Sequence, residues 1–370
     1  MTEDIITALS KVRWFFVIAR NSSFTYKGHA VDVKQVGREL GVRYVLEGSV
    51  RKSGNRLRIT AQLVEATTGN HIWAERYDRE LADIFAVQDE ITERVVAAIE
   101  PQLYAAEHYR SQRKPPESLD AWECVMRALS LVGQGTGAGN AEAEALCQHA
   151  IAIAPSYGQA HGLLAFALER RPIWSGGKTT ILLEASAAAR KALDLDERDP
   201  WAHIAHGMVL YRMRHHSEAE RAFRRALEFN PNFALAHALL GLVLATDGAH
   251  EKAIRNAEHA LRLSPIDRLI DTYASLAVSI AHFAAGRYAE SVSWARNMTE
   301  RYPDYHTAHF VLAAGAAMQG DMEVAAAARS TLLCHRPNFS LAWMSENNPL
   351  AGDMLNRVLE GLRRAGVPET

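Results

Sequence analysis

The chain has 370 residues, 48% of them hydrophobic, and a formal net charge of −2 from 41 Lys and Arg against 43 Asp and Glu. That balance argues against nucleic-acid binding by phosphate neutralisation, which needs a basic face. The three cysteines, Cys124, Cys147 and Cys334, are widely spaced, which argues against a disulfide framework and fits a reducing cytoplasm.

The N-terminal stretch MTEDIITALSKVRWFFVIAR differs from a secretory signal, because its start is acidic and its apolar run is short. No stretch of the sequence approaches the ~20 apolar residues that a membrane-spanning helix needs. We therefore expect a soluble, cytoplasmic protein without a membrane span.

The first elements in chain order are a helix, a strand and a second helix. TEDIITALSK begins at Thr2, a residue suited to a helix cap, and has acidic residues in its first turn. RWFFVIAR (13–20) is a short apolar run of the length of a buried strand. VDVKQVGRELGV (31–42) predicts a helix that ends at Gly41.

Three strands and a long helix complete the first region. The strand segments are RYVLEGSVRK, RLRITAQLVEA and HIWAERYD, with the turn residues Ser53-Gly54-Asn55 and Thr68-Gly69-Asn70 between them. Alternation along the middle strand places Leu57, Ile59, Ala61 and Leu63 on one face. DIFAVQDEITERVVAAIEPQL predicts a strong helix, and residues 111–118 form the predicted linker.

The run YVLEGSVRKSGNRLRITAQLVEATTGNHIWAERYD, followed by DIFAVQDEIT, resembles the TolB-like α/β domain, which precedes tetratricopeptide repeats in many bacterial regulators. In that family the domain opens with a further buried strand, and here Met1 stands where an internal methionine would be. The resemblance implies a TolB-like domain at 1–110 that lacks its first strand, in the C-terminal part of a longer protein. A missing strand would leave an open sheet edge for strand addition or aggregation.

From residue 119 onward the sequence repeats with a period of 34. Two pairs of prolines have this spacing, and a glycine precedes three of the four prolines by 17 residues. A small residue follows each of these glycines by five. The prolines are Pro231, Pro265, Pro303 and Pro337, and the glycines are Gly248, Gly286 and Gly320. A 34-residue period with this pattern is the signature of tetratricopeptide repeats, in which each unit is a pair of antiparallel helices.

The repeat register predicts six units over residues 119–337, followed by a capping helix and tail at 338–370. The segments HALLGLVLATDGAHEKAIRNAEHALRLSP (237–265) and HIAHGMVLYRMRHHSEAERAFRRALEFNP (203–231) resemble the family consensus best. A single hairpin cannot bury its apolar face alone, so neighbouring units must stack. The predicted fold class is α+β, a small α/β sheet domain followed by an all-α superhelix.

The first helix of each unit lines the concave face in this family, and the register places apolar and aromatic side chains there. This face suits an apolar peptide or a partner helix, although packing alone is the alternative. It lacks the Lys/Arg/Asn set with which relatives clamp a terminal carboxylate. The predicted groove residues are Trp201, Ile204, Met208, Tyr211, Leu235, Leu242, Tyr273, Leu276, Ile280 and Phe283.

Other candidate chemistry is weak. SGGKTT (175–180) ends like a phosphate loop, but Pro172 stands at the first required glycine and no strand precedes it. His161, His203, His237 and His309 share one repeat position, and stacked units hold them too far apart for one metal ion. The basic stretch 211–229 is interpreted as the solvated outer face of a repeat helix, with a docking patch for an acidic partner as the alternative. We predict no catalytic residue, cofactor or metal site.

These observations favour a non-catalytic interaction module of a bacterial signalling protein. By family resemblance, its output would be a class III adenylate or guanylate cyclase domain that is not within these residues. A winged-helix transcriptional regulator is the alternative context. A nucleotide-binding enzyme is a further, weaker alternative. The expected partner is a protein or peptide in the groove, with no direct binding of nucleic acid.

Overall fold

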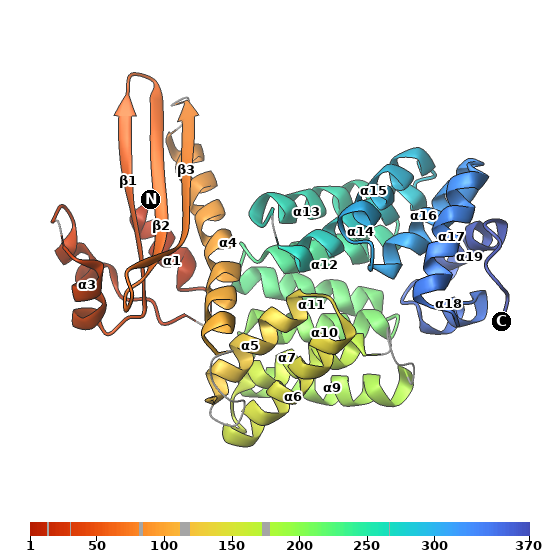
Figure 1. The fold of residues 1–370 in the computed structure, drawn as a ribbon, viewed down its shortest axis with the longest axis horizontal. Coiled ribbons are helices and arrows are strands. Elements are labelled where there is room, and N and C mark those ends of the chain that lie inside the picture. Colours follow the sequence, from red (N-terminus) through yellow and green to blue (C-terminus); the bar gives the residue numbers. More distant parts are fainter. Residues whose placement is uncertain (13–14, 30, 81–83, 112–118, 172–177, 266) are drawn as a thin grey trace. The chain divides into compact units, whose positions relative to one another are not determined.

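The computed structural model describes residues 1–370 except 13–14, 30, 81–83, 112–118, 172–177 and 266 (Figure 1). The chain divides into two compact units, Met1–Lys114 and Pro115–Thr370. Most of the predicted linker lies outside the described residues. Among the described residues, no helix is both long enough and apolar enough to cross a membrane.

The first unit is built on a three-stranded antiparallel sheet in the order β1-β2-β3. The strands are β1 (Tyr44–Ser53), β2 (Arg56–Glu65) and β3 (Asn70–Glu80). The two tight turns between them contain Gly54 (φ 61°) and Gly69 (φ 80°), which supply the positive φ that the turns require. The three predicted strands and both turns are therefore confirmed.

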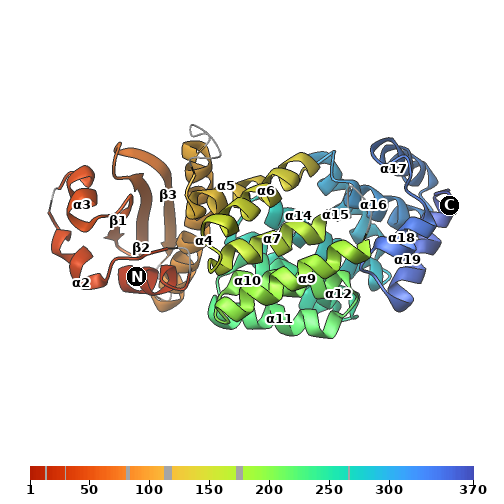
Figure 2. The same ribbon diagram turned by 90° about the horizontal axis from the view of Figure 1, so that it is seen from below.

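The helices α1 (Thr2–Leu9) and α4 (Ile84–Ser111) pack against one face of this sheet. The unit also contains α2 (Arg20–Ser23), the short 3-10 helix η1 (Phe24–Tyr26) and α3 (Val33–Leu40). Within the unit, α3 adjoins β1 and α4 adjoins β3 (Figures 1 and 2). The alternate residues of β2 from Leu57 to Leu63 are buried against Ile91 and Val95 of α4. This is the face that the alternation predicts.

The predicted strand RWFFVIAR is wrong for its described part. Residues 15–19 have no regular structure, and the side chain of Phe16 is 89% exposed. Phe15 and Val17 still pack against the core on the other side. A strand needs a ladder partner to form. Among the described residues, the outer edge of β1 pairs with no strand, so apolarity alone was a poor guide here.

The second unit contains six helical hairpins in its described residues, as the 34-residue period predicts. They follow one another in chain order (Figures 1 and 2). The pairs are α5 (Ala121–Gly133) with α6 (Gly137–Ile153), α7 (Gly158–Arg170) with α9 (Lys178–Leu195), α10 (Pro200–Arg212) with α11 (His216–Phe229), α12 (Ala234–Thr246) with α13 (His250–Leu263), α14 (Arg268–Ala284) with α15 (Tyr288–Arg301), and α16 (His306–Gln319) with α17 (Met322–His335). Two further helices close the chain, α18 (Leu341–Asn347) and α19 (Gly352–Arg364).

Small residues let the two helices of each hairpin approach closely. Ala253 and Ala260 are completely buried, as are Ala219 and Ala226 at the same positions one unit earlier. A Cβ atom added at Gly241 would lie 3.0 Å from the backbone oxygen of Ala253. These small side chains leave the space that the second helix of the hairpin occupies.

The four histidines at one repeat position have a structural role. The Nε2 atom of each lies 2.8–2.9 Å from a backbone carbonyl oxygen six residues earlier, at the end of the preceding hairpin. The pairs are His161 with Pro155, His203 with Glu197, His237 with Pro231 and His309 with Pro303. Each imidazole thus ties the first turn of a helix to the loop before it, and satisfies a carbonyl group beyond the end of the preceding helix.

Candidate functional site

The helical unit contains a pocket that every hairpin borders. The turn of the first hairpin contributes Gly133 and Gly135, α7 contributes Glu169 and Arg170, and α10 contributes Met208, Tyr211 and Arg212. The helix α12 contributes Leu242, and α14 contributes Leu269, Thr272, Tyr273, Leu276 and Ile280. The start of α16 contributes Tyr305, His306 and Phe310. The C-terminal segment adds Trp343 and 347–350. The six hairpins therefore curve around one shared space.

Six of the ten predicted groove residues border this pocket: Met208, Tyr211, Leu242, Tyr273, Leu276 and Ile280. The other four pack between helices: Trp201, Ile204, Leu235 and Phe283 are at most 4% exposed. The ring of Trp201, for example, lies 5.8 Å from that of Phe166 and 5.5 Å from that of Phe233. The structure therefore brings together six of these side chains, and their contact with a peptide stays a prediction.

A buried ion pair, which no sequence pattern indicated, lies in the wall of the pocket. The Nε atom of Arg212 donates to Oε2 of Glu169 over 2.8 Å, and the side chains are 15% and 0% exposed. Burial is the largest single influence and would lower the pKa of Arg212, but the charge of Glu169, its hydrogen bond and the nearby tyrosines together raise it. The other carboxylate oxygen of Glu169 has no hydrogen-bond partner among the described residues.

The interpretation of the basic stretch 211–229 as an outer face is therefore wrong for Arg212. This residue ends α10, the inner helix of its hairpin, whereas Arg224 and Arg225 lie on the outer helix α11. Arg224 and Arg225 are half exposed and pair with Glu220 and Glu228 of their own helix. The stretch crosses from one helix to the other, so its arginines face in different directions.

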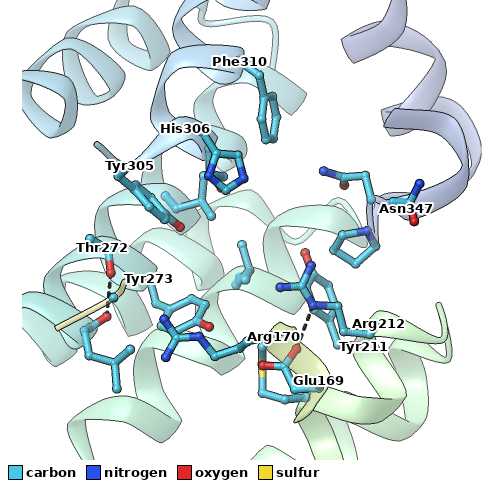
Figure 3. Close-up of a pocket in the computed structure, with 18 of the residues that line it drawn as sticks. Glu169, Arg170, Tyr211, Arg212, Thr272, Tyr273, Tyr305, His306, Phe310 and Asn347 are labelled. Carbon is cyan, nitrogen blue, oxygen red and sulfur yellow. Dashed lines mark hydrogen bonds and ion pairs between the residues drawn. The ribbon is translucent and has the colours of Figure 1, made fainter. Parts of the chain in front are cut away.

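Aromatic hydroxyl groups face the rest of the pocket. Figure 3 shows Tyr305, His306 and Phe310 on the side opposite Glu169, Tyr211 and Arg212. Burial raises the pKa of Tyr211, Tyr273 and Tyr305 above the ordinary value, so their hydroxyl groups stay neutral. The walls of the pocket thus combine apolar side chains and neutral hydroxyl groups with the charged side chains of Glu169, Arg170, Arg212, Arg268 and Asp304.

His306 is neutral as well. The pKa of His306 is lowered to about 3, mainly by burial and secondly by the charge of Arg336. The Nη1 atom of Arg336 lies 3.3 Å from Nε2 of His306, and this ring nitrogen can accept a hydrogen bond from the guanidinium group. The guanidinium group of Arg336 also lies 4.1 Å from the centre of the Trp343 ring. Arginine, imidazole and indole together fix one corner of the pocket.

Other chemistry finds little support in the described part of the chain. It contains no group of three or more His, Cys, Asp and Glu side chains that could hold a metal ion. Cys124 is buried, which raises its pKa to about 11 and keeps the thiol protonated. Residues 175–177 of SGGKTT lie outside the described residues, and Lys178 begins α9.

A tetratricopeptide repeat model matches residues 202–233, the α10–α11 hairpin and the loop after it. Over 222 residues the chain is 44% identical to "Putative adenylate cyclase 3" of Rhizobium meliloti (strain 1021). That match covers 60% of this chain and 38% of the relative, so the chain spans well under half of the relative's length.

Solved structures with similar folds are much more distant in sequence. PilW, a widely conserved type IV pilus biogenesis factor, is 16% identical with a TM-score of 0.43, over 56% of this chain and 89% of PilW. A chain of the Cut9–Hcn1 hetero-tetramer of the APC/C is 14% identical with a TM-score of 0.49, over 73% of this chain and 48% of that chain. These likenesses are too remote to carry an argument. The repeat match and the six hairpins identify the helical unit as a tetratricopeptide superhelix.

Proposed function

We propose that the helical unit binds a peptide segment of a partner protein in the pocket that the six hairpins border. The observation that carries the proposal is the composition of this pocket. Tyr211, Tyr273 and Leu276 offer apolar surface for a side chain. Neutral hydroxyl groups and His306 offer hydrogen bonds to the main chain of a peptide, which an extended segment must satisfy when it is buried.

The chain as a whole is proposed to be a non-catalytic, cytoplasmic part of a bacterial signalling protein with an adenylate or guanylate cyclase output. The 44% identity to a protein named as a putative adenylate cyclase supports this context. We also propose that the first unit is a TolB-like domain. Its three strands and its α4 helix follow the segments that carry that resemblance.

The peptide proposal is tested by panning the full chain against a phage-displayed library of random peptides. We expect an enriched motif that contains an apolar residue. The motif should bind tenfold or more weakly to the variant Tyr305→Ala, which alters the pocket. Tyr302→Ala is the matched control, because Tyr302 lies three residues away but does not border the pocket. Equal binding to both variants would place the peptide elsewhere.

The cyclase proposal is tested at the level of the gene. Sequencing the genomic region upstream of Met1 is expected to reveal a cyclase catalytic domain in the same frame or in an adjacent gene. A winged-helix domain in that place would instead favour a transcriptional regulator. Measuring cyclic nucleotide production by the neighbouring domain, with and without this chain, would then establish whether the two are coupled.

A further inference from the structure

The turn of the α10–α11 hairpin departs from the pattern of the four other hairpin turns that the structure describes. Four of the described hairpin turns contain a glycine with φ between 69° and 93°. These glycines are Gly135, Gly248, Gly286 and Gly320. Arg214 stands 34 residues before Gly248 and has a φ of 65°, and it is the one residue other than glycine with a positive φ in the described chain. A side chain with a Cβ atom disfavours this conformation, so Arg214 is in a place where the repeat prefers glycine.

The guanidinium group of Arg214 contacts the far end of the unit. Its Nε and Nη2 atoms donate to the carbonyl oxygen of Asn348 over 3.2 and 3.0 Å, and Nη2 also donates to the carbonyl oxygen of Ser345. His216 adds a further contact, with Nε2 2.9 Å from the carbonyl oxygen of Pro349. These contacts join positions that are more than 130 residues apart in the sequence. We call Arg214 and His216 the clasp, and residues 345–350 the strap.

The strap lies against the pocket. Asn347, Asn348, Pro349 and Leu350 all border it, and Figure 3 shows Asn347 approaching from the end of α18. Leu350 is 1% exposed, so the strap buries an apolar side chain beside the space where we place a peptide. Its main-chain carbonyl groups face the clasp. Residues 348–350, the part of the strap beyond α18, thus have two features of a bound peptide, an inserted apolar residue and recognised carbonyl groups.

We propose that the strap is an internal occupant of the peptide site, and that a partner peptide must displace it from the clasp. This inference rests on the proposed function. The partner is an extended segment with an apolar residue close to two successive carbonyl groups, like the Asn348-Pro349-Leu350 sequence of the strap. Because the clasp contacts the main-chain oxygens of Asn348 and Pro349, an extended peptide can make these bonds through two successive carbonyl groups.

The strap can leave without unfolding the rest of the unit. The beginning of α18 is held separately, because the amide groups of Leu341 and Ala342 donate to the carbonyl oxygens of Pro368 and Glu369. On the other side of the strap, α19 packs against α16. The segment between these two anchors is short, and its main-chain bonds to the other hairpins come from the clasp. Release therefore needs movement of a few residues only.

The first test is hydrogen exchange of the full chain, comparing the wild type with Arg214→Gly. Glycine suits the turn, so the hairpin is retained while the clasp is weakened. We expect at least tenfold faster exchange at residues 345–351, with unchanged exchange in α10–α17. Arg287→Gly is the control, because Arg287 lies in another hairpin turn and donates to Glu251 instead. Unchanged exchange in the strap, or faster exchange throughout the hairpins, would overturn the proposal.

The second test uses a fluorescent peptide with the sequence WMSENNPLAG of residues 343–352. The variant Leu350→Asp weakens the strap and leaves the clasp intact, so it should bind the peptide at least fivefold more tightly than the wild type. Combining Leu350→Asp with Arg214→Gly should abolish this gain. Equal binding to the wild type and Leu350→Asp, or no binding to any of the chains, would contradict displacement.

The two proposals fail in different ways. The exchange experiment involves no ligand, so it reports on the strap even if panning finds no peptide for the pocket. Conversely, a panned peptide that binds through Tyr305 without loosening residues 345–350 would support the peptide site and reject the strap as its occupant.

Discussion

The α10–α11 and α12–α13 hairpins are successive repeat units, but their equivalent positions hold different residues that pack differently. Gly207 of α10 accommodates the ring of Phe223, whereas Gly241 of α12 faces the backbone of α13 and Ala257. The first hairpin turns through Arg214, which contacts the strap, and the second turns through Gly248, which has open space around it. Where the α10–α11 sequence departs from the repeat pattern, at Arg214, the departing residue acts outside its own hairpin.

Replacing the α10–α11 residues by their α12–α13 counterparts tests this comparison, and Phe223→Ala should have the largest effect. Phe223 is completely buried, and its counterpart is Ala257. Removing the ring leaves a cavity beside Gly207, so the free energy of unfolding should fall by about 4 kcal/mol. Urea unfolding of the full chain measures this loss. A loss below about 1 kcal/mol would show that the two helices close together as they do in the α12–α13 hairpin.

Arg212→Thr introduces the residue that ends α12, and it should have the next largest effect. The substitution leaves the carboxylate of Glu169 buried without its partner, which should cost about 3 kcal/mol. The double variant Arg212→Thr with Glu169→Leu should recover most of that loss, because it removes both charges. Absence of recovery in urea unfolding would mean that Arg212 acts through packing and not through the ion pair.

Arg214→Gly should change the stability of the unit only slightly. It removes charge-assisted hydrogen bonds to the strap, but it also relieves a positive φ that disfavours arginine by about 1 kcal/mol. We expect a net loss of ~1 kcal/mol or less by urea unfolding. The converse variant, Gly248→Arg, places arginine where no strap is near and should be the more destabilising of the two. An increase in stability on Arg214→Gly, which relief of the positive φ alone would give, would argue against the clasp.

The smallest effect concerns pH and His259, whose counterpart in the α10–α11 hairpin is the solvated Arg225. Burial, and after it the charge of His237, lowers the pKa of His259 to about 4. The unfolded chain therefore binds this proton more readily, and stability should fall as the pH drops below about 6.5 and level off below about 4. His259→Gln should reduce the difference between urea midpoints at pH 7 and pH 5. An unchanged difference would assign the pH dependence to other buried histidines.

Periodic features of the fold could be predicted from the sequence. The period of 34 indicated the hairpins, and alternation in β2 indicated its buried face, because both patterns reflect packing between close neighbours. The shared histidine position was also assigned to the repeat, although its carbonyl partner six residues earlier was not foreseen. These residues have the same neighbours in each unit, so the same residue types recur at the same positions of the repeat.

Contacts that occur once could not be predicted in the same way. The register named Trp201 and Phe283 for the groove, but it does not distinguish helix positions that face the pocket from those that pack on the next helix. It also gave no hint of the strap, whose contacts to Arg214 span more than 130 residues. The one available signal was the absence of glycine from the turn position of a single hairpin.

We propose that the pocket of the helical unit binds a peptide in place of the strap. The most direct measurement is hydrogen exchange of the full chain with and without a peptide selected by panning. We predict slower exchange at 268–276 and 304–310, which border the pocket, together with faster exchange at 345–350. Protection confined to the β1 strand of the first unit, or no change at the pocket, would contradict the account.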